Sequence, residues 1–525
     1  MTAGPAQENP VAATETGAWP THWIIEAKDQ AATERVAAEI AGMLRPGDLV
    51  TLGGGLGVGK TTFARALIRA LCGDDGLEVP SPTFTLIQTY DAPRHPIVHA
   101  DLYRIENPRE LDSLGWNETA DGAVLVVEWA DRAGALLAPD RLDVSFAMEP
   151  DAPDVRILTL TGHGTFSARL GLAKSIHLLL RGCGMAQAQR HHLQGDASTR
   201  VYERLHLPSA RPAPTAILMI APKRPDGPAI RNGRPYSQIA KLAEDVKPFV
   251  AMARGLRARG FSAPEIYGAD LQAGLLVLED FGAEGVLEQG EVVEERYAEA
   301  TALLAALHQM ELPRDLPVDD GIVHTLPRAD LEAMLVEVEL MPDWYLPHKG
   351  HHALSATSRI AFIDLWSALL QPLLAGPGTW LLRDYHSPNL HWLADREGIR
   401  RIGLIDFQDA LYGPAAYDVV SLLQDARVDV PDAMELRLLS HYARLRRQED
   451  PAFDMAGFAQ AYAVLGAQRA TKILGIFARL NRRDHKPGYL RHLPRIERNV
   501  VRCLAHPALA ELRQWYAANL PDLFA

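Results

Sequence analysis

A glycine-rich stretch near residue 55 restricts the fold of this chain more than any other feature. It reads Gly54-Gly-Leu-Gly-Val-Gly59-Lys60-Thr61, which fits the pattern glycine, four residues, glycine, lysine, then serine or threonine. An apolar run at 48–52 precedes it and predicts a strand, and apolar residues at helical spacing over 62–71 follow it. This strand–loop–helix order indicates a phosphate-binding loop inside an α/β domain.

Residues 21–168 alternate between predicted helices and short apolar strands. Apolar residues at helical spacing cover 31–44, and apolar runs predict further strands at 97–100, 123–127 and 142–148. Short apolar strands separated by helices favour a mainly parallel sheet that is covered on both faces. We therefore expect an α/β domain of the P-loop NTPase type over 21–168, preceded by a disordered tail over 1–20.

The loop residues are predicted to bind ATP with Mg²⁺. The backbone N–H groups would face phosphate oxygens, the Lys60 amine would reach the β and γ phosphates, and the Thr61 hydroxyl would bind Mg²⁺. Two acidic residues close neighbouring predicted strands, where ligands bind in open α/β sheets. Glu128 is the expected metal ligand, and Asp101 is expected to position water. The predicted nucleotide-binding residues are Gly54, Gly55, Leu56, Gly57, Val58, Gly59, Lys60, Thr61 and Thr62.

The sequence from about residue 191 has a different pattern. Apolar runs predict strands at 201–207, 216–220 and 275–278, with a helical stretch at 239–259. From residue 294 onward the chain is predicted to be mostly helical, with strand-like segments at 379–382, 390–393 and 400–405. We expect a linker over 169–190 and then an α+β domain over 191–525, with a small strand-rich lobe over about 191–282 and a helical lobe over about 283–525.

Three polar residues at fixed spacing predict a second phosphate site in this domain. Asp384 and Asn389 lie in Arg383-Asp384-Tyr-His-Ser-Pro-Asn389 after an apolar run, and Asp406 closes a later apolar run. This order matches the catalytic and metal-binding loops of protein-kinase-like phosphotransferases, so we expect a bilobal fold of that kind. Asp384 would accept a proton from the substrate hydroxyl or orient it, and Asn389 and Asp406 would hold Mg²⁺ on the ATP phosphates.

Further nucleotide contacts are predicted in the small lobe. Gly195 and Ser198 would lie in a loop over the phosphates, and Glu279 would end the strand that enters the interlobe hinge, where the backbone meets adenine. A lysine is expected in the third strand of such a lobe, but 216–220 offers Met219, and Lys223 beyond the strand is the substitute that we consider. The missing lysine leaves open a catalytically silent binding module as an alternative.

Five motifs of the first half occur in a characteristic order. They are Gly55-Leu-Gly-Val-Gly-Lys-Thr-Thr-Phe-Ala-Arg, Ser81-Pro-Thr-Phe84, Asp101-Leu-Tyr-Arg104, Glu110-Leu-Asp-Ser-Leu-Gly115 and Val127-Glu-Trp129. This series resembles the TsaE family, the small ATPase subunit of the bacterial machinery that makes threonylcarbamoyladenosine at position 37 of tRNAs. The resemblance implies that Lys60 and Thr61 bind nucleotide and metal, that Glu128 binds Mg²⁺, and that Thr83 belongs to a nucleotide-sensing loop. It also implies ATP hydrolysis coupled to other subunits of the transfer complex, with tRNA contacted only indirectly.

Four motifs of the second half carry another resemblance. They are Gly195-Asp-Ala-Ser, Leu276-Val-Leu-Glu-Asp-Phe281, the stretch from Arg383 to Asn389, and Asp406-Phe-Gln-Asp-Ala-Leu-Tyr-Gly-Pro-Ala-Ala-Tyr-Asp418. The series resembles the aminoglycoside-phosphotransferase superfamily. Within it the chain is most similar to the AmgK-type kinases, which phosphorylate the anomeric hydroxyl of N-acetylmuramate and N-acetylglucosamine in cell-wall recycling. The resemblance implies an ATP- and Mg²⁺-dependent amino-sugar kinase, and an antibiotic-modifying aminoglycoside kinase stays open as an alternative.

The charge balance and the cysteine content disfavour several other classes. The chain has 53 Lys and Arg against 66 Asp and Glu, a net charge of −13, so nucleic-acid binding through bulk electrostatics is not expected. Three widely spaced cysteines favour a reducing compartment, and no apolar run approaches the ~20 residues of a membrane helix. We therefore expect a cytoplasmic protein without a membrane partner. The basic stretch from Arg469 to Arg483 is interpreted as a solvated helix face, and His191 and His192 as linker residues.

Overall fold

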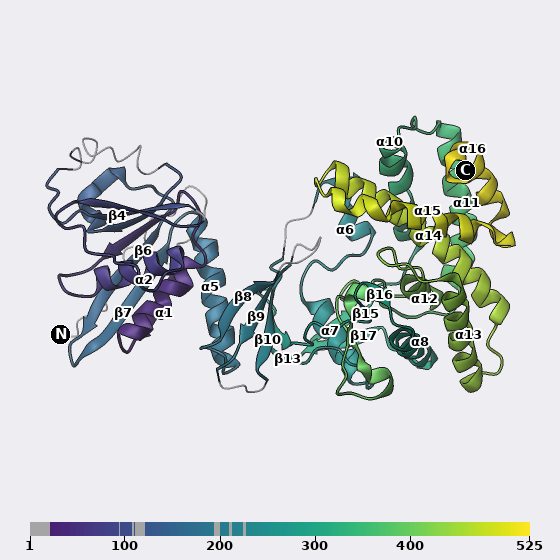
Figure 1. Cartoon of the computed structure of the whole chain (residues 1–525), viewed down its shortest axis with the longest axis horizontal. Helices are drawn as coiled ribbons and strands as arrows, with labels where there is room; N and C mark the ends of the chain where they lie inside the picture. Colours follow the sequence, from purple (N-terminus) through teal and green to yellow (C-terminus); the bar gives the residue numbers. More distant parts are fainter. Residues whose placement is uncertain are drawn as a thin grey trace, which may run out of the picture. The chain divides into compact units, whose positions relative to one another are not determined.

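The chain folds into two compact units, which are described separately. The computed structural model describes residues 21–93, 95–107, 110, 121–193, 200–208, 213–223 and 227–524 (Figure 1). One unit spans Met1–Arg181 and the other spans Gly182–Ala525. Each unit has buried apolar clusters of its own, so each has its own core.

The first unit is built on one sheet of seven strands. These are β1 (Thr21–Ala27), β2 (Leu49–Gly53), β3 (Ile87–Asp91), β4 (Pro96–Asp101), β5 (Val124–Glu128), β6 (Leu142–Glu149) and β7 (Ala152–Gly162), in the order β1-β7-β6-β2-β5-β4-β3. The helical segments are α1 (Gln30–Ala41), α2 (Lys60–Cys72), η1 (Ala130–Leu136) and α5 (Thr165–Gly182). Strands β6, β2, β5 and β4 run parallel to one another. The predicted mainly parallel sheet is confirmed for these four central strands.

Three strands of this sheet are not predicted from the sequence. β1, β3 and β7 pair antiparallel with their neighbours. Exposed, half-buried and buried residues mix along β1, β3 has no buried residue, and buried and half-buried residues alternate along the second half of β7. Antiparallel strands can bury a single face, so they lack the continuous apolar run that marks the central strands.

The central strands are buried on both faces. On one face α1, α2 and the start of α5 form an apolar cluster with Val50, Leu52 and Val126. On the other face Leu49 and Val127 pack with η1 and the segment after β4. Because β2, β4 and β5 are parallel, their carboxyl ends meet at one edge of the sheet, which places the ends of these strands beside the glycine-rich loop.

The second unit begins with an antiparallel sheet of five strands. These are β8 (Gln189–Leu193), β9 (Val201–His206), β10 (Thr215–Ile220), β13 (Ile266–Asp270) and β14 (Leu275–Glu279), in the order β13-β14-β10-β9-β8. Helix α7 (Lys247–Arg257) contributes to the same apolar cluster as β10 and β14. The helix predicted over 239–259 is interrupted, because the short α6 (Tyr236–Ile239) ends before α7 begins.

The segment 169–190, predicted as a linker, includes the boundary between the two units at Arg181 and Gly182 and contains regular structure. α5 continues to Gly182 and buries apolar residues at helical spacing, and β8 begins at Gln189. His191 and His192 lie on β8, where they pair with Arg204 and Glu203 of β9. β8 is an exposed, polar edge strand, so its sequence has no apolar run that would predict it.

The rest of the second unit is mainly helical, as predicted. The longer helices are α8 (Glu294–Gln309), α9 (Leu331–Val338), α11 (Ala356–Ala375), α12 (Ala416–Leu423), α13 (Asp432–Glu449), α14 (Met455–Arg482), α15 (Leu493–Leu504) and α16 (Ala510–Asn519). Short helical segments are η2 (Met341–Tyr345), α10 (Leu346–His348), η3 (Ser387–Asn389), η4 (Gly398–Arg401), η5 (Pro487–His492), η6 (Pro507–Leu509) and η7 (Pro521–Phe524). Helices α14 and α15 lie side by side (Figure 1).

Short strand pairs complete this unit. They are β11 (Ala229–Arg231) with β12 (Arg234–Pro235), β15 (Leu287–Glu288) with β16 (Glu291–Val292), β17 (Asp315–Asp319) with β18 (Ile322–Thr325), β19 (Thr379–Leu381) with β22 (Leu411–Gly413), and β20 (Leu390–Trp392) with β21 (Ile402–Leu404). The last pair is the hairpin predicted between 390 and 405. It places the end of β21 beside the start of β20, which positions the residues that flank the hairpin.

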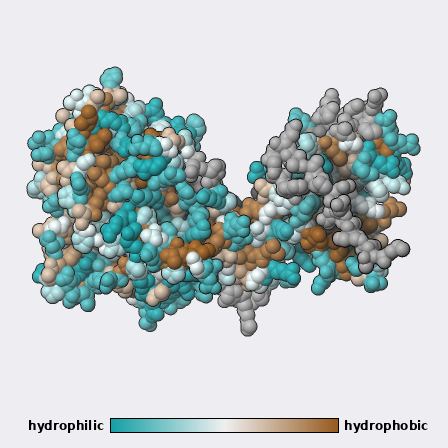
Figure 2. Space-filling model, turned by 180° about the vertical axis from the view of Figure 1, so that it is seen from behind, coloured by the Kyte–Doolittle hydropathy of each residue, from teal (hydrophilic) through white to brown (hydrophobic). Residues whose placement is uncertain are grey.

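The described surface is mostly polar. Exposed large apolar side chains of the second unit lie on separate elements, such as Ile230 on β11, Ile360 on α11 and Leu436 on α13. On the face of this unit seen at the left of Figure 2, hydrophilic residues predominate. Among the described residues, no helix is both long and apolar enough to cross a bilayer.

Candidate active sites

The loop between β2 and α2 makes turns that favour glycine. Gly54, Gly57 and Gly59 have φ angles of 127°, 76° and 108°, which residues with a Cβ atom rarely adopt. A Cβ atom on Gly54 would also lie 2.6 Å from the carbonyl oxygen of Phe146. Gly59 is the N-cap of α2, and the N–H groups of the first helical turn have no acceptor within the helix. The loop and the helix start therefore have the geometry of an anion-binding site.

Lys60, the first residue of α2, is 5% exposed and lies over the loop. Its Nζ donates to the carbonyl oxygens of Gly54 at 2.9 Å and Gly55 at 2.7 Å, and it lies 4.0 Å from the ring centre of Trp129. Burial lowers the pKa of Lys60, and the carboxylate of Glu128 opposes this effect. The amine is thus held where it would meet phosphates bound in the loop.

Thr61 and Glu128, the two predicted magnesium ligands of this unit, are in direct contact. Thr61 Oγ1 donates to Glu128 Oε2 at 3.0 Å, and Glu128 Oε1 lies 3.1 Å from Nε2 of the buried His99. Hydroxyl and carboxylate oxygens suit Mg²⁺, which usually completes its shell with phosphate oxygens and water. The residues present therefore fit Mg²⁺. His99, a polar residue inside an apolar strand, is a residue that sequence reasoning missed, and its contact orients the carboxylate.

Asp101 lies beside Glu128 at the ends of β4 and β5. Asp101 Oδ2 accepts a hydrogen bond from Thr83 Oγ1 at 2.7 Å, and Oδ1 accepts one from the backbone N–H of Tyr103 at 3.0 Å. The structure thus brings Thr83 to the strand-end acids of this site. The positioning of water by Asp101 and the sensing of nucleotide by Thr83 stay predictions.

The structure brings Asp384, Asn389 and Asp406 together in the second unit. Asn389 Nδ2 donates to the backbone carbonyl of Asp384 at 2.9 Å and lies 3.5 Å from Asp406 Oδ2. Asp406 has a positive φ of 58°, a conformation that is uncommon for residues other than glycine. The amide oxygen of Asn389 and the carboxylate of Asp406 are hard ligands that fit Mg²⁺. Within the described residues, no group of three His, Cys, Asp or Glu is arranged to hold a metal ion.

Basic side chains surround Asp384. Its Oδ1 lies 3.9 Å from Nε2 of His386, which in turn lies 3.4 Å from Nη1 of Arg427. Desolvation favours the neutral form of Asp384, but the nearby His386, Lys472 and Arg383 outweigh it and lower its pKa below the ordinary value. Asp384 is therefore ionised at neutral pH and can accept a hydrogen bond from a substrate hydroxyl.

A buried aspartate without a predicted role holds the segment that precedes Asp384. Asp418, on α12, accepts hydrogen bonds from the backbone N–H groups of Leu382 at 2.6 Å and Arg383 at 2.8 Å. Burial raises the pKa of Asp418 to about 7, although the two N–H groups oppose this. A single aspartate within the apolar sequence of α12 is the signal that could have identified it. Asp418 therefore fixes the backbone that directly precedes Asp384.

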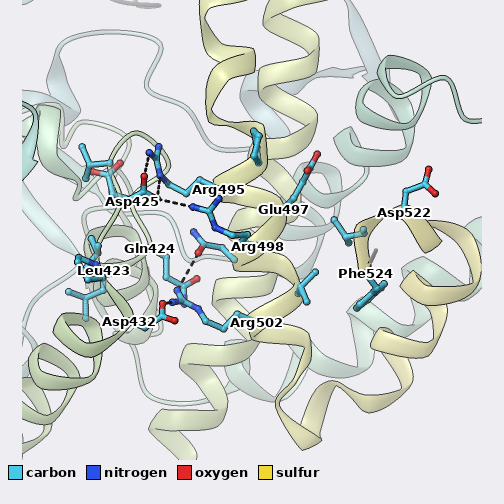
Figure 3. A pocket seen from close by; sticks show the side chains of 18 residues that line it. Leu423, Gln424, Asp425, Asp432, Arg495, Glu497, Arg498, Arg502, Asp522 and Phe524 are labelled. Atoms are coloured by element: carbon cyan, nitrogen blue, oxygen red, sulfur yellow. Dashed lines mark hydrogen bonds and ion pairs between the residues drawn. The ribbon is translucent and has the colours of Figure 1, made fainter.

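A pocket of about 700 Å³ lies next to the same loop (Figure 3). Residues from the end of α12, the segment that follows it, α15 and η7 line this pocket. Asp425 in its wall accepts hydrogen bonds from the backbone N–H and the hydroxyl of Ser387, at 2.9 and 2.6 Å. The arginines in the wall are paired with acids: Arg495 and Arg498 with Asp429, and Arg502 with Glu435. Asp384, Asn389 and Asp406 are not among the residues that line this pocket.

The basic stretch of α14 begins with two buried residues, so its interpretation as a solvated helix face is wrong for these two, whereas Arg482 at the end of the helix is exposed. Arg469 and Lys472 are 5% and 9% exposed. Lys472 Nζ lies 2.8 Å from Glu337 Oε1, and the same carboxylate oxygen accepts a hydrogen bond from Arg383. The acid comes from α9, and the second cation, Arg383, comes from the segment that follows β19. Both are far away in the sequence, so the local pattern of α14 indicates neither.

Glu337→Gln is expected to destabilise the second unit by about 3–5 kcal/mol, because it leaves two buried cations without their acid. Burial opposes ionisation of Glu337, but Lys472 and Arg383 lower its pKa to about 2. A carboxylate with a lowered pKa stabilises the native state above its ordinary pKa of 4.5, and this contribution disappears as the pH falls toward 2. The variant should therefore lose the most stability at neutral pH and less at about pH 3.

Denaturation of the full chain at both pH values measures this effect. Glu332→Gln is the control, because Glu332 forms a partly exposed pair with Arg234. The control should lower the free energy of unfolding by less than about 1 kcal/mol. Equal losses in the two variants would contradict the stabilising role of the buried cluster.

The predicted nucleotide contacts of the small lobe have different outcomes. Gly195 and Ser198 lie outside the described residues, so their roles stay predictions. Glu279 ends β14, its amide N–H donates to the carbonyl of Glu265 at 2.8 Å, and its carboxylate pairs with Arg396. This N–H group is therefore engaged within the sheet, and the contact of Glu279 with a base stays a prediction.

Comparison with known proteins assigns both parts of the chain. Residues 27–156 match the family model of the threonylcarbamoyl adenosine biosynthesis protein TsaE, and residues 191–455 match that of the phosphotransferase enzyme family. An N-acetylmuramate/N-acetylglucosamine kinase of Caulobacter vibrioides is 37% identical over 369 residues, which cover 68% of this chain and 98% of that protein. A TsaE protein of Rickettsia bellii is 38% identical over 129 residues, 25% of this chain and 88% of that protein. The chain belongs to both families.

Other relatives agree with this assignment. An N-acetylmuramate/N-acetylglucosamine kinase of Pseudomonas aeruginosa is 33% identical over 287 residues, which cover 53% of this chain and 79% of that protein. The two resemblances read from the sequence motifs are thus confirmed. The glycine-rich loop belongs to the TsaE part of the chain, and the cluster of Asp384, Asn389 and Asp406 belongs to the phosphotransferase part.

Proposed function

We propose that this chain carries two ATP-dependent activities. The TsaE part would hydrolyse ATP in support of threonylcarbamoyladenosine formation at position 37 of tRNA, with the other subunits of the transfer complex as its partners. The phosphotransferase part would transfer the γ-phosphoryl group of ATP to the anomeric hydroxyl of an amino sugar, with N-acetylmuramate and N-acetylglucosamine as acceptors. The names of the relatives support both activities. ATP, tRNA and the partner subunits are cytoplasmic, so the proposal places the protein in the cytoplasm.

The convergence of Asp384, Asn389 and Asp406 is the observation that supports the kinase activity. Asp384 would orient the acceptor hydroxyl and take its proton, because its carboxylate is ionised. Asn389 and Asp406 would hold Mg²⁺, which neutralises the charge of the transferred phosphoryl group when it is bound. Asp418 keeps the backbone before Asp384 in place, which would maintain the position of this base relative to the metal ligands.

The charges around Asp384 favour an amino sugar over an aminoglycoside antibiotic. Aminoglycosides are polycations and need acidic groups around them, whereas Lys472, Arg383 and the buried Arg469 contribute positive charge near Asp384 and lower its pKa. Such surroundings suit a neutral sugar or one with a carboxylate. N-acetylglucosamine is a neutral sugar, and N-acetylmuramate carries a carboxylate.

An acceptor panel tests this proposal. The full chain is incubated with radiolabelled MgATP and, separately, with N-acetylmuramate, N-acetylglucosamine and two aminoglycosides. We expect labelled phosphate on the anomeric oxygen of both amino sugars and none on the aminoglycosides. Phosphorylation of an aminoglycoside without transfer to either amino sugar would contradict the proposed substrate class.

For the TsaE part, the contact of Thr61 with Glu128 beside Lys60 supports ATP binding and hydrolysis. Lys60 would neutralise the β and γ phosphates, and the Thr61 hydroxyl with the Glu128 carboxylate would hold the metal. The chemistry of threonylcarbamoyl transfer would remain with the partner subunits. The net charge of −13 agrees with an indirect role toward tRNA, because a bulk negative charge repels nucleic acid.

A further inference from the structure

The phosphotransferase part lacks a cation at one expected position. Met219 stands in the strand that normally offers a lysine to the α and β phosphates. Met219 lies opposite Leu276 and Tyr202 in the sheet and is 1% exposed within the apolar core. Its side chain is therefore core packing, and β10 supplies no positive charge at this position.

Arg200 brings a positive charge to the same end of the sheet. It directly precedes β9, whose first residue, Val201, pairs with Ile220 at the end of β10. Arg200 Nη1 lies 3.1 Å from Asp406 Oδ1, and Gln408 Nε2 donates to the same oxygen at 2.9 Å. A guanidinium of the strand-rich lobe thus contacts the carboxylate that is proposed to hold Mg²⁺.

Three other cations of the phosphotransferase part are less suited to replace the missing strand lysine. Both nitrogens of the Arg204 fork bind the carboxylate of Asp280, at 2.7 and 3.2 Å. Lys223 is exposed beyond β10. Lys472 pairs with the buried Glu337. Arg200 is the cation whose contact places it directly at the metal-binding carboxylate.

We propose that Arg200 binds the phosphates of ATP in place of the missing strand lysine, an inference that rests on the proposed kinase function. In the MgATP complex Asp406 is needed as a metal ligand, and the Arg200 guanidinium then pairs with phosphate oxygens beside it. The planar fork of arginine matches two phosphate oxygens, and a guanidinium stays charged at every physiological pH. Without nucleotide, the Arg200 guanidinium would therefore offset the negative charge of the Asp406 carboxylate. With MgATP bound, it would contribute to the binding energy of the nucleotide.

Nucleotide binding without an acceptor sugar tests this role. The measurements use the full chain carrying Lys60→Ala, so that the glycine-rich loop of the TsaE part contributes little to the signal. Equilibrium titrations give the Kd of MgATP and of adenosine, which has no phosphate. Arg200→Ala is expected to raise the Kd of MgATP roughly 10- to 100-fold, the range of a charged hydrogen bond. The Kd of adenosine should stay within about twofold.

Arg190→Ala is the matched control. Arg190 lies on β8 of the same sheet and pairs with Glu203 at 2.6 Å, so the variant removes the same side chain and the same charge. It should leave both dissociation constants within about twofold of those of the parent. Arg200→Lys, which keeps the charge and loses the fork, should fall between the parent and Arg200→Ala.

Two results would overturn the proposal. An unchanged or tighter Kd of MgATP in Arg200→Ala would show that Arg200 only balances the charge of Asp406. An equal weakening of MgATP and adenosine would show a structural role in the lobe. Thermal unfolding checks that each variant is folded, and Arg200→Gln replaces Arg200→Ala if the alanine variant is not. If the parent protein itself fails to bind MgATP, the proposed kinase function fails as well, which separates the two outcomes.

Discussion

Asp384→Asn is expected to lower the rate of phosphoryl transfer to the amino sugar by about 10²- to 10⁴-fold, the usual contribution of a general base. The amide has the size of the carboxylate but cannot take the proton of the acceptor hydroxyl. Asp384 is 38% exposed and does not belong to the apolar core, so the fold should tolerate the change. The Kd of MgATP should change little, because Asn389 and Asp406 are the proposed metal ligands.

Steady-state kinetics with the preferred amino sugar and a nucleotide-binding titration measure the two quantities separately. Asp343→Asn is a suitable control, since Asp343 forms a surface pair with Arg359 on other elements of the same unit. It should retain the rate of the unmodified protein. A full rate in Asp384→Asn would remove Asp384 from the mechanism, and no transfer by the unmodified protein would favour the catalytically silent module.

Lys60→Ala is expected to abolish the tRNA-related activity of the TsaE part while leaving the sugar kinase intact. The amine is buried over the loop and would compensate the charge of bound phosphates, so its removal should slow ATP hydrolysis by at least about 10²-fold. The phosphotransferase cluster is made of other residues in the other unit, so its rate should not change. The variant therefore tests whether the two activities are separate.

Complementation of a bacterial strain that lacks its own TsaE measures threonylcarbamoyladenosine in tRNA, and a sugar-kinase assay on the same purified variant measures the second activity. Lys174→Ala is the control, because Lys174 lies on α5 and its Nζ only donates to the carbonyl of His22. Full complementation by Lys60→Ala would contradict the proposed mechanism. Loss of the kinase activity in this variant would contradict the independence of the two sites.

The sequence predicts a site best where the site residues are neighbours along the chain or stand at the ends of apolar strands. The glycine-rich loop meets both conditions, and the parallel pairing of β2, β4 and β5 then brings Asp101 and Glu128 to the same edge. Asp384 and Asn389 are five positions apart, and the β20–β21 hairpin returns the chain to Asp406. Local patterns and one rule of sheet geometry suffice to predict that these residues lie close together.

The same reasoning fails where a contact joins segments without a local signal. Lys472 looks like a surface residue of a helix until α9 places Glu337 against it. Strand β8 is too polar to be recognised, since an edge strand needs hydrogen bonds from a neighbour more than an apolar face. Arg200 becomes notable only when the fold brings Asp406 to it. Such contacts depend on tertiary packing, which periodicity in one segment does not report.

The carboxylate of Glu337 has a consequence for how this protein can evolve. It joins three segments that are far apart in the sequence: α9, the segment after β19 through Arg383, and α14 through Lys472. Loss of Glu337 leaves two cations in the interior without their acid, whereas replacement of all three residues by apolar residues of similar volume could be tolerated. We therefore expect lineages that change Glu337 to change Arg383 and Lys472 as well.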